Sequence, residues 1–267
     1  MSERQTMDAN QPLAARRVVV TRTRERASAL SARLLSLGAE VIEMPVLRIS
    51  REISKENLAD VMLEFGTYDW LVFTSGSGVH FFFEEFLRLH DDIRALGLIR
   101  IACVGDGTAR GVAALRLHVE CQPAKATAGD LAAELIATGS LENAKVLVIT
   151  GNLNRDVLVK KLEAARAIVD CLQVYKTETT DLSGSPAAAD YRSRGADAVL
   201  FASSSSAQSF SDQGASLKLA PGAMRPLTGS IGPQTSATMR KCGFAVDFEA
   251  VTPGIDELID ALVRKLG

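Results

Sequence analysis

Short apolar runs alternate with longer amphipathic stretches through most of the chain. Residues 17–21 hold three successive valines, a pattern expected of a strand that is buried on both faces. Leu30, Leu34 and Leu37 follow on one helical stripe, which Thr23 can cap and which Gly38 ends. The same alternation predicts further strands at residues 39–50, 70–74, 100–104, 118–121, 145–150, 169–177, 198–202, 227–231 and 245–248. Further helices are predicted at residues 79–86, 108–115, 130–136, 154–166 and 256–266.

Strands that alternate with helices of this length indicate βαβ units, and therefore parallel, doubly wound sheets of the α/β class. The second half of the pattern also repeats the first. Residue 39 aligns with residue 167 and residue 71 with residue 199, each at an offset of 128. Residue 105 aligns with residue 232 at an offset of 127. A repeat of about half the chain predicts two similar copies of one domain.

The two predicted domains do not divide the chain at its middle. Residues 50–168 supply a complete set of strands for one sheet, whereas residues 15–43 complete the sheet that residues 178–267 form. We therefore predict a discontinuous first α/β domain and an inserted second α/β domain. The segments 44–49 and 169–177 are expected to join them as a two-stranded β connector.

The composition is that of a globular protein, and it argues against several classes of partner. Of the 267 residues, 47% are hydrophobic and 23% are charged, and the formal net charge is −2. This charge argues against nucleic acid or an anionic membrane as the main partner. No apolar run approaches the roughly 20 residues of a membrane helix. Four cysteines without paired spacing, and a polar start without the apolar core of a signal peptide, predict a cytoplasmic protein.

Four of the predicted strands end in small, hydroxyl-rich turns at residues 75–78, 105–108, 203–206 and 232–235. Ligands of open parallel sheets bind beyond the carboxyl ends of the strands, and helix N-termini offer backbone N–H groups there. Each turn therefore suits a phosphate or a carboxylate, although such residues can also serve simply as helix caps. Four turns, two in each domain, favour a large polyanionic ligand.

Cofactor and metal sites find less support in the sequence. Gly76 and Gly78 follow a strand as in a dinucleotide-binding fingerprint, but Phe81 occupies the third small position. A flavin mononucleotide would need a Gly- or Thr-rich loop after the first strand, where this chain has Arg22 and its charged neighbours. The three histidines share no metal-ligand spacing and support no Ser–His–Asp set. We therefore expect neither a metal nor a cofactor.

Six short segments occur in a fixed order at residues 20–22, 73–79, 104–109, 174–175, 201–203 and 231–235. In order and spacing they resemble the uroporphyrinogen-III synthase family, from residue 17 onwards. The resemblance implies a cofactor-free enzyme of haem, sirohaem and cobalamin biosynthesis. Such an enzyme cyclises linear hydroxymethylbilane to uroporphyrinogen III, with inversion of ring D and loss of water. The resemblance also implies two α/β domains joined by a two-stranded ladder, an active site between them, and a functional tyrosine at Tyr175.

A polycarboxylate substrate of this kind suits several helix N-termini and a few cations. Tyr175 can supply the proton with which the hydroxyl group leaves as water, or it can pack the connector as an ordinary strand aromatic. Only one copy of the repeat carries this tyrosine, since Leu47 takes its place in the other. The expected substrate-binding residues are Arg22, Ser75, Gly76, Ser77, Gly105, Thr108, Arg155, Lys176, Ser203, Ser204, Ser205, Gly232 and Thr235.

Two other functions fit the same duplicated architecture. A two-lobed sensor of a tetrapyrrole or another small ligand would keep the fold without turnover, and a scaffold domain would act within a larger complex. The enzyme is expected to be a monomer that makes transient contact with hydroxymethylbilane synthase. A reaction assay with hydroxymethylbilane separates the enzyme from these alternatives.

Overall fold

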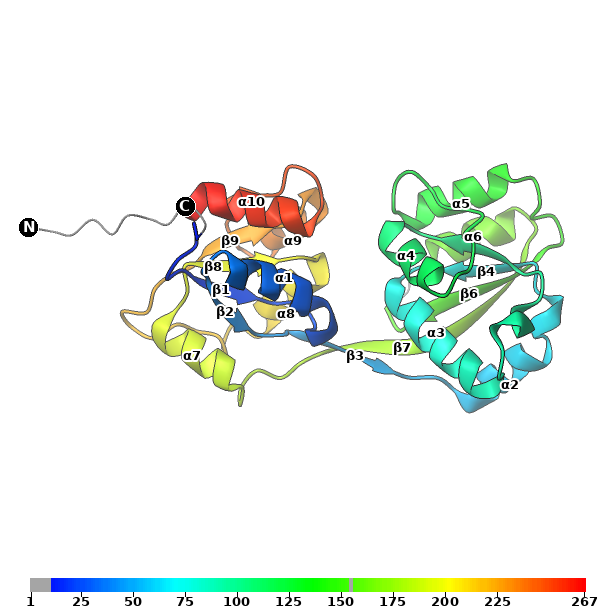
Figure 1. Ribbon diagram of the computed structural model, residues 1–267, viewed down its shortest axis with the longest axis horizontal. Coiled ribbons are helices and arrows are strands. Elements are labelled where there is room, and N and C mark those ends of the chain that lie inside the picture. Colours follow the sequence, from blue (N-terminus) through cyan, green and yellow to red (C-terminus); the bar gives the residue numbers. More distant parts are fainter. Residues whose placement is uncertain (1–10, 154–155) are drawn as a thin grey trace, which may run out of the picture. The chain divides into compact units, whose positions relative to one another are not determined.

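The computed structural model describes residues 11–153 and 156–267, which form two compact units (Figure 1). Unit 1 comprises Met1–Arg48 and Glu178–Gly267, and unit 2 comprises Ile49–Thr177. The chain therefore passes twice from one unit to the other. Both passages lie in strands, β3 (Leu47–Arg51) and β7 (Ile168–Thr179), which are neighbours in one sheet.

Unit 1 is built on a five-stranded sheet in the order β10-β9-β8-β1-β2, and all of its paired strands are parallel. The strands are β1 (Arg17–Val20), β2 (Glu40–Glu43), β8 (Ala198–Phe201), β9 (Leu227–Ser230) and β10 (Phe248–Glu249). The helices are α1 (Arg24–Ser36), α7 (Pro186–Arg194), α8 (Ser204–Asp212), α9 (Pro233–Lys241) and α10 (Ile255–Leu266). Successive side chains of a strand point to opposite faces, so Val18 and Val20 pack in one core and Val19 packs in another. The first core contains residues of α1 and α10, and the second contains residues of α7, α8 and α9.

Unit 2 repeats this plan around the sheet β3-β7-β6-β4-β5. Its other strands are β4 (Trp70–Phe73), β5 (Arg100–Cys103) and β6 (Lys145–Gly151). Its helices are α2 (Lys55–Leu63), α3 (Gly76–Leu89), α4 (Asp106–Ala114), α5 (Ala128–Ala137) and α6 (Val157–Ala164), with short 3₁₀ helices at η1 (Phe65–Thr67) and η2 (Ile93–Leu96). Phe82, Phe83 and Phe86 of α3 fill the core on one face. Leucines of α5 and α6 fill the core on the other face.

Three of the predicted strands differ in the structure. The run 39–50 forms two strands, β2 and β3, that belong to different sheets. Pro45 lies in the break between them, where it has no N–H group to donate to a ladder. Residues 118–121 form no strand and contribute only an isolated bridge between Ala102 and Cys121. His118 and Glu120 in this segment are exposed. The last strand is shorter than predicted and begins only at Phe248.

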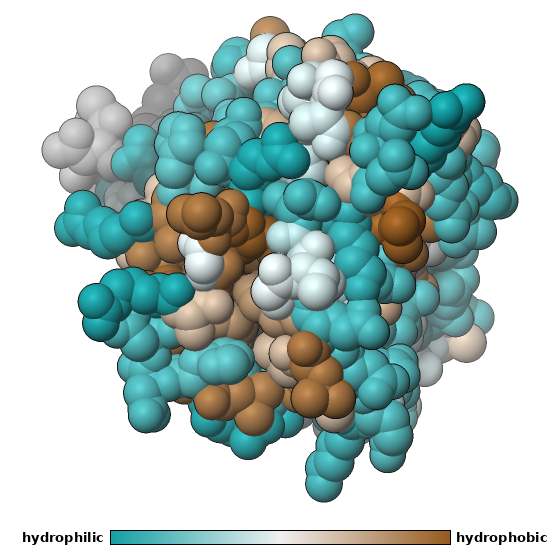
Figure 2. Space-filling model, turned by 90° about the vertical axis from the view of Figure 1, so that its right-hand side faces the viewer, coloured by the Kyte–Doolittle hydropathy of each residue, from teal (hydrophilic) through white to brown (hydrophobic). Residues whose placement is uncertain are grey.

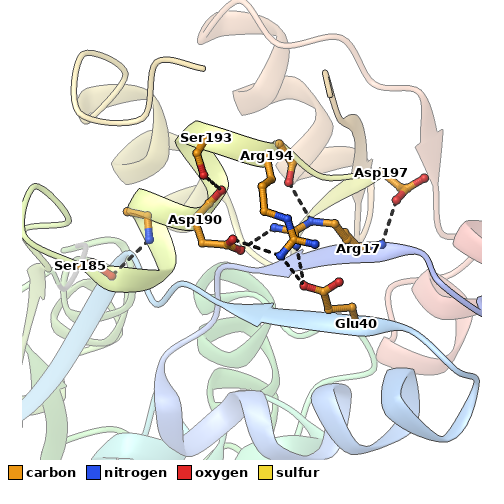
Figure 3. A network of polar contacts seen from close by, with 9 residues as sticks. Arg17, Glu40, Ser185, Asp190, Ser193, Arg194 and Asp197 are labelled. Carbon is orange, nitrogen blue, oxygen red and sulfur yellow. Dashed lines mark hydrogen bonds and ion pairs between the residues drawn. The ribbon is translucent and has the colours of Figure 1, made fainter. Parts of the chain in front are cut away.

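A polar network ties the start of β1 to α7 and β2 in unit 1 (Figure 3). The guanidinium group of Arg17, whose side chain is 7% exposed, lies 2.5 Å from carboxylate oxygens of both Glu40 and Asp190. Its Nε donates to the carbonyl oxygen of Gly195 at 3.2 Å. Arg194 contacts the same two carboxylates from the last turn of α7. A buried guanidinium needs such partners, since an unpaired buried charge is strongly destabilising.

Candidate functional site

The turns predicted after the strands of unit 2 lie side by side. β4 and β5 are neighbouring parallel strands, so α3 and α4 begin at the same edge of the sheet. Ser75 caps α3 and accepts a hydrogen bond from the N–H group of Gly78 at 3.0 Å. A Cβ atom on Gly76 would lie 3.8 Å from the carbonyl oxygen of Gly107, which places the two helix starts next to each other. Gly105 holds the N-cap position of α4.

Tyr175 reaches this edge through an irregularity in β7. β7 pairs with β6 in register up to Thr150 and Gln173, after which Gly151 faces Tyr175 and Val174 is the extra residue. Such a bulge bends the strand and redirects the side chain that follows it. A Cβ atom at Gly151 would lie 2.4 Å from atoms of the Tyr175 ring, so only glycine lets the ring occupy this position. Phe81 of α3 stacks on the ring, with centroids 6.3 Å apart and planes at 23°.

The hydroxyl group of Tyr175 is held by the cap of α3. Ser75 Oγ donates to Tyr175 Oη at 3.0 Å, and the same Oγ accepts the N–H group of Gly78. Because the single hydroxyl hydrogen of Ser75 is used toward the tyrosine, the phenolic hydrogen of Tyr175 remains available to another acceptor. Tyr175 is half-buried. The arrangement therefore presents a partly exposed O–H donor beside two helix N-termini.

Unit 1 has the corresponding pair of helix starts after β8 and β9. Ser203 caps α8 and accepts from the N–H group of Ser206 at 3.1 Å, and Ser205 Oγ lies 3.2 Å from Ser203 Oγ. Gly232 precedes α9. Ser204 Oγ donates to the carbonyl oxygen of Gln234 at 3.2 Å, which joins the two turns. Both units thus present paired helix N-termini, the arrangement that binds carboxylate or phosphate groups.

The four turns at the ends of these strands are shorter than the four-residue turns predicted from the sequence. In each, a single N-cap residue precedes the helix and the other residues form its first turn. Thr108 and Thr235 are only 5% and 4% exposed, so each presents little surface to a ligand. Thr23 holds the N-cap position of α1, but its buried hydroxyl makes no cap hydrogen bond with any described residue.

The charged candidates have different surroundings. Arg22 is half-buried and lies two residues after the end of β1, directly before Thr23. Lys176 follows Tyr175 on β7, and its Nζ lies 3.8 Å from a carboxylate oxygen of Glu52. Ser77 lies in the first turn of α3. Arg155 lies outside the described residues.

Two residues that position Tyr175, Phe81 and Gly151, are not among the site residues expected from the sequence. Phe81 is conspicuous there only as a bulky residue in a glycine-rich turn, and Gly151 directly follows the predicted strand 145–150. A glycine at the end of a strand is itself a signal of close backbone approach. Asn152 then exchanges hydrogen bonds with the backbone of Thr177, at 3.1 and 2.8 Å, and so supports β7 beyond the bulge.

The two buried cysteines of unit 2 argue against thiolate chemistry. Burial raises the pKa of the Cys103 thiol to about 12 and that of Cys121 to about 11. A nucleophilic cysteine needs the opposite shift. Among the described residues, no cluster of histidine, cysteine or acidic side chains could hold a metal ion. No described helix is both long and apolar enough to cross a membrane.

Fold and site together define a duplicated two-domain α/β protein with paired helix N-termini in each domain and a tyrosine beside one pair. The chain belongs to the family described as uroporphyrinogen-III synthase HemD, whose sequence profile matches residues 28–260. The resemblance seen in the short motifs and the α/β class are thereby confirmed. The family's enzyme is a cyclising lyase that acts on hydroxymethylbilane in tetrapyrrole biosynthesis.

Individual proteins show the same similarity. The chain is 27% identical over 261 residues to the uroporphyrinogen-III synthase of Synechococcus elongatus, and the match covers 95% of this chain and 97% of that protein. It is 28% identical over 177 residues to the porphyrin biosynthesis protein HemD of Ruminiclostridium josui, and this match spans only 35% of that longer protein. A mutant uroporphyrinogen III synthase from the extremely thermophilic bacterium Thermus thermophilus superposes with a TM-score of 0.64 over 94% of this chain and 99% of that one. At 18% identity, this last likeness shows the fold.

Proposed function

We propose that this chain cyclises hydroxymethylbilane to uroporphyrinogen III in the cytoplasm, with inversion of ring D and loss of water, and that Tyr175 is the proton donor. The observation that carries the proposal is the Tyr175 hydroxyl, held at 3.0 Å by Ser75 beside the N-termini of α3 and α4. A donor positioned within hydrogen-bond reach of a leaving hydroxyl is what general acid catalysis requires. The helix starts beside it suit the carboxylate groups of the same substrate.

In the first step of the proposed reaction, the phenol of Tyr175 gives its proton to the terminal hydroxyl group of the bilane. The carbon–oxygen bond breaks, water leaves, and the resulting cation attacks ring D at its substituted carbon. The spiro intermediate then fragments and recloses with ring D inverted. The proton that the product finally loses restores the phenol. Holding ring D against closure at its free position is a positioning task, and proximity alone supplies much of such a rate enhancement.

The carboxylates of the substrate are proposed to bind at the helix N-termini of each unit and at a few cations. The proposed residues of unit 2 are Ser75, Gly76, Ser77, Gly105, Thr108, Arg155 and Lys176. Those of unit 1 are Arg22, Ser203, Ser204, Ser205, Gly232 and Thr235. Hydroxymethylbilane also closes unaided, to the isomer without inversion. We therefore propose that it reaches this chain through transient contact with hydroxymethylbilane synthase.

The decisive experiment supplies freshly made hydroxymethylbilane to the purified protein and resolves the product isomers by chromatography. Uroporphyrinogen III is the expected product, and heat-denatured protein should yield only the type I isomer. If the native protein also yields only type I while it binds the substrate, the chain is a ligand sensor without turnover.

A further inference from the structure

A second concave site lies in unit 2, and none of the residues proposed for the tetrapyrrole lines it. It is a groove of about 520 Å³ beside α2 and the end of α3. Leu58, Met62 and Leu89 give it an apolar lining, together with Leu63, which is 86% exposed. Figure 2, which faces the end of unit 2, shows hydrophobic side chains gathered on this side of the molecule among hydrophilic ones. An exposed apolar lining in a concave site is typical of ligand-binding grooves.

The rim of the groove is cationic because a buried carboxylate holds two arginines there. Glu85 is only 1% exposed, and its Oε1 lies 2.7 Å from Arg51 Nη2. Its Oε2 lies 2.9 Å from Arg88 Nη2 and accepts from Arg88 Nε at 2.9 Å. The two arginine side chains are themselves 49% and 57% exposed. Each guanidinium carries five N–H donors, so both retain donors for an anion besides their contacts with Glu85.

The charges at the groove do not cancel. Lys55 adds a third cation to the rim, against the single carboxylate of Glu85. Among the described residues that line the groove, none is acidic. The positions of the two arginines are also set in advance by Glu85, which lowers the conformational cost of binding an anion.

We propose that this groove binds a small amphipathic carboxylate, with its apolar body on the leucines and its carboxylate on Arg51 and Arg88. The size of the groove decides between a small molecule and a protein partner. A volume of about 520 Å³ lies within the range of small-molecule sites, which is roughly 300–1,000 Å³. A stable protein interface needs roughly 20–30 residues on each side, far more than line this groove. The site is separate from the proposed active site and does not rest on the proposed function.

The test uses the full-length protein and decanoate as the probe, with binding followed by isothermal titration calorimetry. One saturable site is expected, with a Kd below about 1 mM. Decyltrimethylammonium has the same chain with a positive head, and acetate has the head without the chain. Both should bind at least about tenfold more weakly, because each lacks one of the two complementary features.

Two substitutions localise the site. Ala59→Trp fills the groove, and Lys55→Glu reverses a rim charge, so each should weaken decanoate at least about tenfold. Lys160→Glu, at an exposed lysine of α6, is the matched charge control and should bind like the wild type. Unchanged binding by Ala59→Trp and Lys55→Glu, equal binding of the cationic probe, or no saturable heat at about 5 mM decanoate would overturn the proposal. If Ala59→Trp fails to fold, Lys55→Glu decides alone. The cyclisation activity of both variants should equal that of the wild type, which separates this test from the proposed function.

Discussion

Three contacts hold the ring of Tyr175, and each comes from a different part of unit 2. Gly151 on β6 leaves room beneath the ring, Phe81 on α3 stacks against it, and Ser75 binds its hydroxyl. A tyrosine that served only to fill the sheet would need the first two contacts but not the third. The hydroxyl is therefore the group to test.

Tyr175→Phe should lower kcat by about 10²-fold or more, because the general acid is lost while the ring contacts stay. KM should change little, since the missing interaction is made in the transition state. Steady-state kinetics with separation of the product isomers measures both quantities. A phenylalanine enzyme with normal kcat and normal isomer yield would mean that Tyr175 only packs the strand.

Tyr68→Phe is the matched control for this variant. Tyr68 lies in the same unit but donates its hydroxyl hydrogen to Asp170 at 2.8 Å. Burial, followed by this hydrogen bond, raises the pKa of Tyr68 well above its ordinary value. Its phenolic proton is thus already committed within the fold. Tyr68→Phe should therefore keep full activity and lose only about 1 kcal/mol of stability.

Gly151→Ala tests the position of the ring without touching the tyrosine. The added Cβ would overlap ring atoms at 2.4 Å, so Tyr175 must move away from Ser75. We expect kcat to fall at least about tenfold, and we expect little further loss when Tyr175→Phe is added, because both changes remove the same group. Independent, multiplying losses in the double variant would show that Gly151 acts elsewhere.

At the scale of single elements, the corresponding helices α1 and α6 of the two repeats are followed by different residues in the left-handed conformation. α1 is followed by Gly38 with φ of 90°, whereas α6 is followed by Arg166 with φ of 66°. The left-handed region costs a residue with a side chain about 1–2 kcal/mol, and glycine avoids most of this cost. The arginine at this helix end is therefore strained.

Arg166→Gly should be more stable than Arg166→Ala by about 1 kcal/mol, as measured by urea unfolding. Both variants lose the exposed ion pair with Glu142, so the comparison isolates the backbone. The reverse change, Gly38→Ala, should destabilise the protein, because its Cβ would also lie 3.0 Å from Gln11 Cβ. Equal stability of the two Arg166 variants would contradict a left-handed conformation there.

The network of Arg17 makes the stability of unit 1 depend on pH. The side-chain hydrogen bond from Arg17, with smaller contributions from the charges of Arg17 and Arg194, lowers the pKa of Asp190 below its ordinary value. A carboxylate with a depressed folded-state pKa contributes stability above its unfolded pKa, and this contribution is lost as the pH falls through its folded pKa. Stability should therefore fall as the pH drops below about 4.

The measurement is the urea midpoint of the protein from about pH 6 to about pH 3. Asp190→Asn removes the titrating group, so the variant should lose less stability over this range than the wild type does. Its stability at neutral pH should already be lower. An identical acid dependence in both proteins would show that other carboxylates carry it.

At the scale of the whole molecule, each unit has its own sheet and its own two cores. The insertion of unit 2 between Arg48 and Glu178 means that its two ends lie in β3 and β7, which are neighbouring strands. A fragment of residues 49–177 therefore contains a complete core and begins and ends on adjacent strands.

We expect this fragment to fold alone and to unfold cooperatively, with circular dichroism typical of an α/β protein. Residues 11–48 joined to 178–267 by a short Gly-Ser linker form the complementary test of unit 1. A fragment 49–177 without a cooperative transition would show that unit 2 depends on unit 1 for stability.

The local alternation of apolar and polar residues was sufficient to predict the α/β class, most of the strands, the duplication and the small residues that begin α3, α4, α8 and α9. These features depend on neighbours within a few positions, where propensity, periodicity and capping act. The order and spacing of the short motifs also predicted membership of the uroporphyrinogen-III synthase family.

The tertiary structure alone decided which of these residues meet. It divided the run 39–50 between two sheets and placed a bulge before Tyr175. It set that ring on Gly151 and against Ser75, which is 100 positions away in the chain. It also brought Arg51 of β3 to Glu85 of α3 at one groove. Strand register and side-chain partners of this kind depend on packing between distant segments, and local sequence patterns do not encode the distances involved.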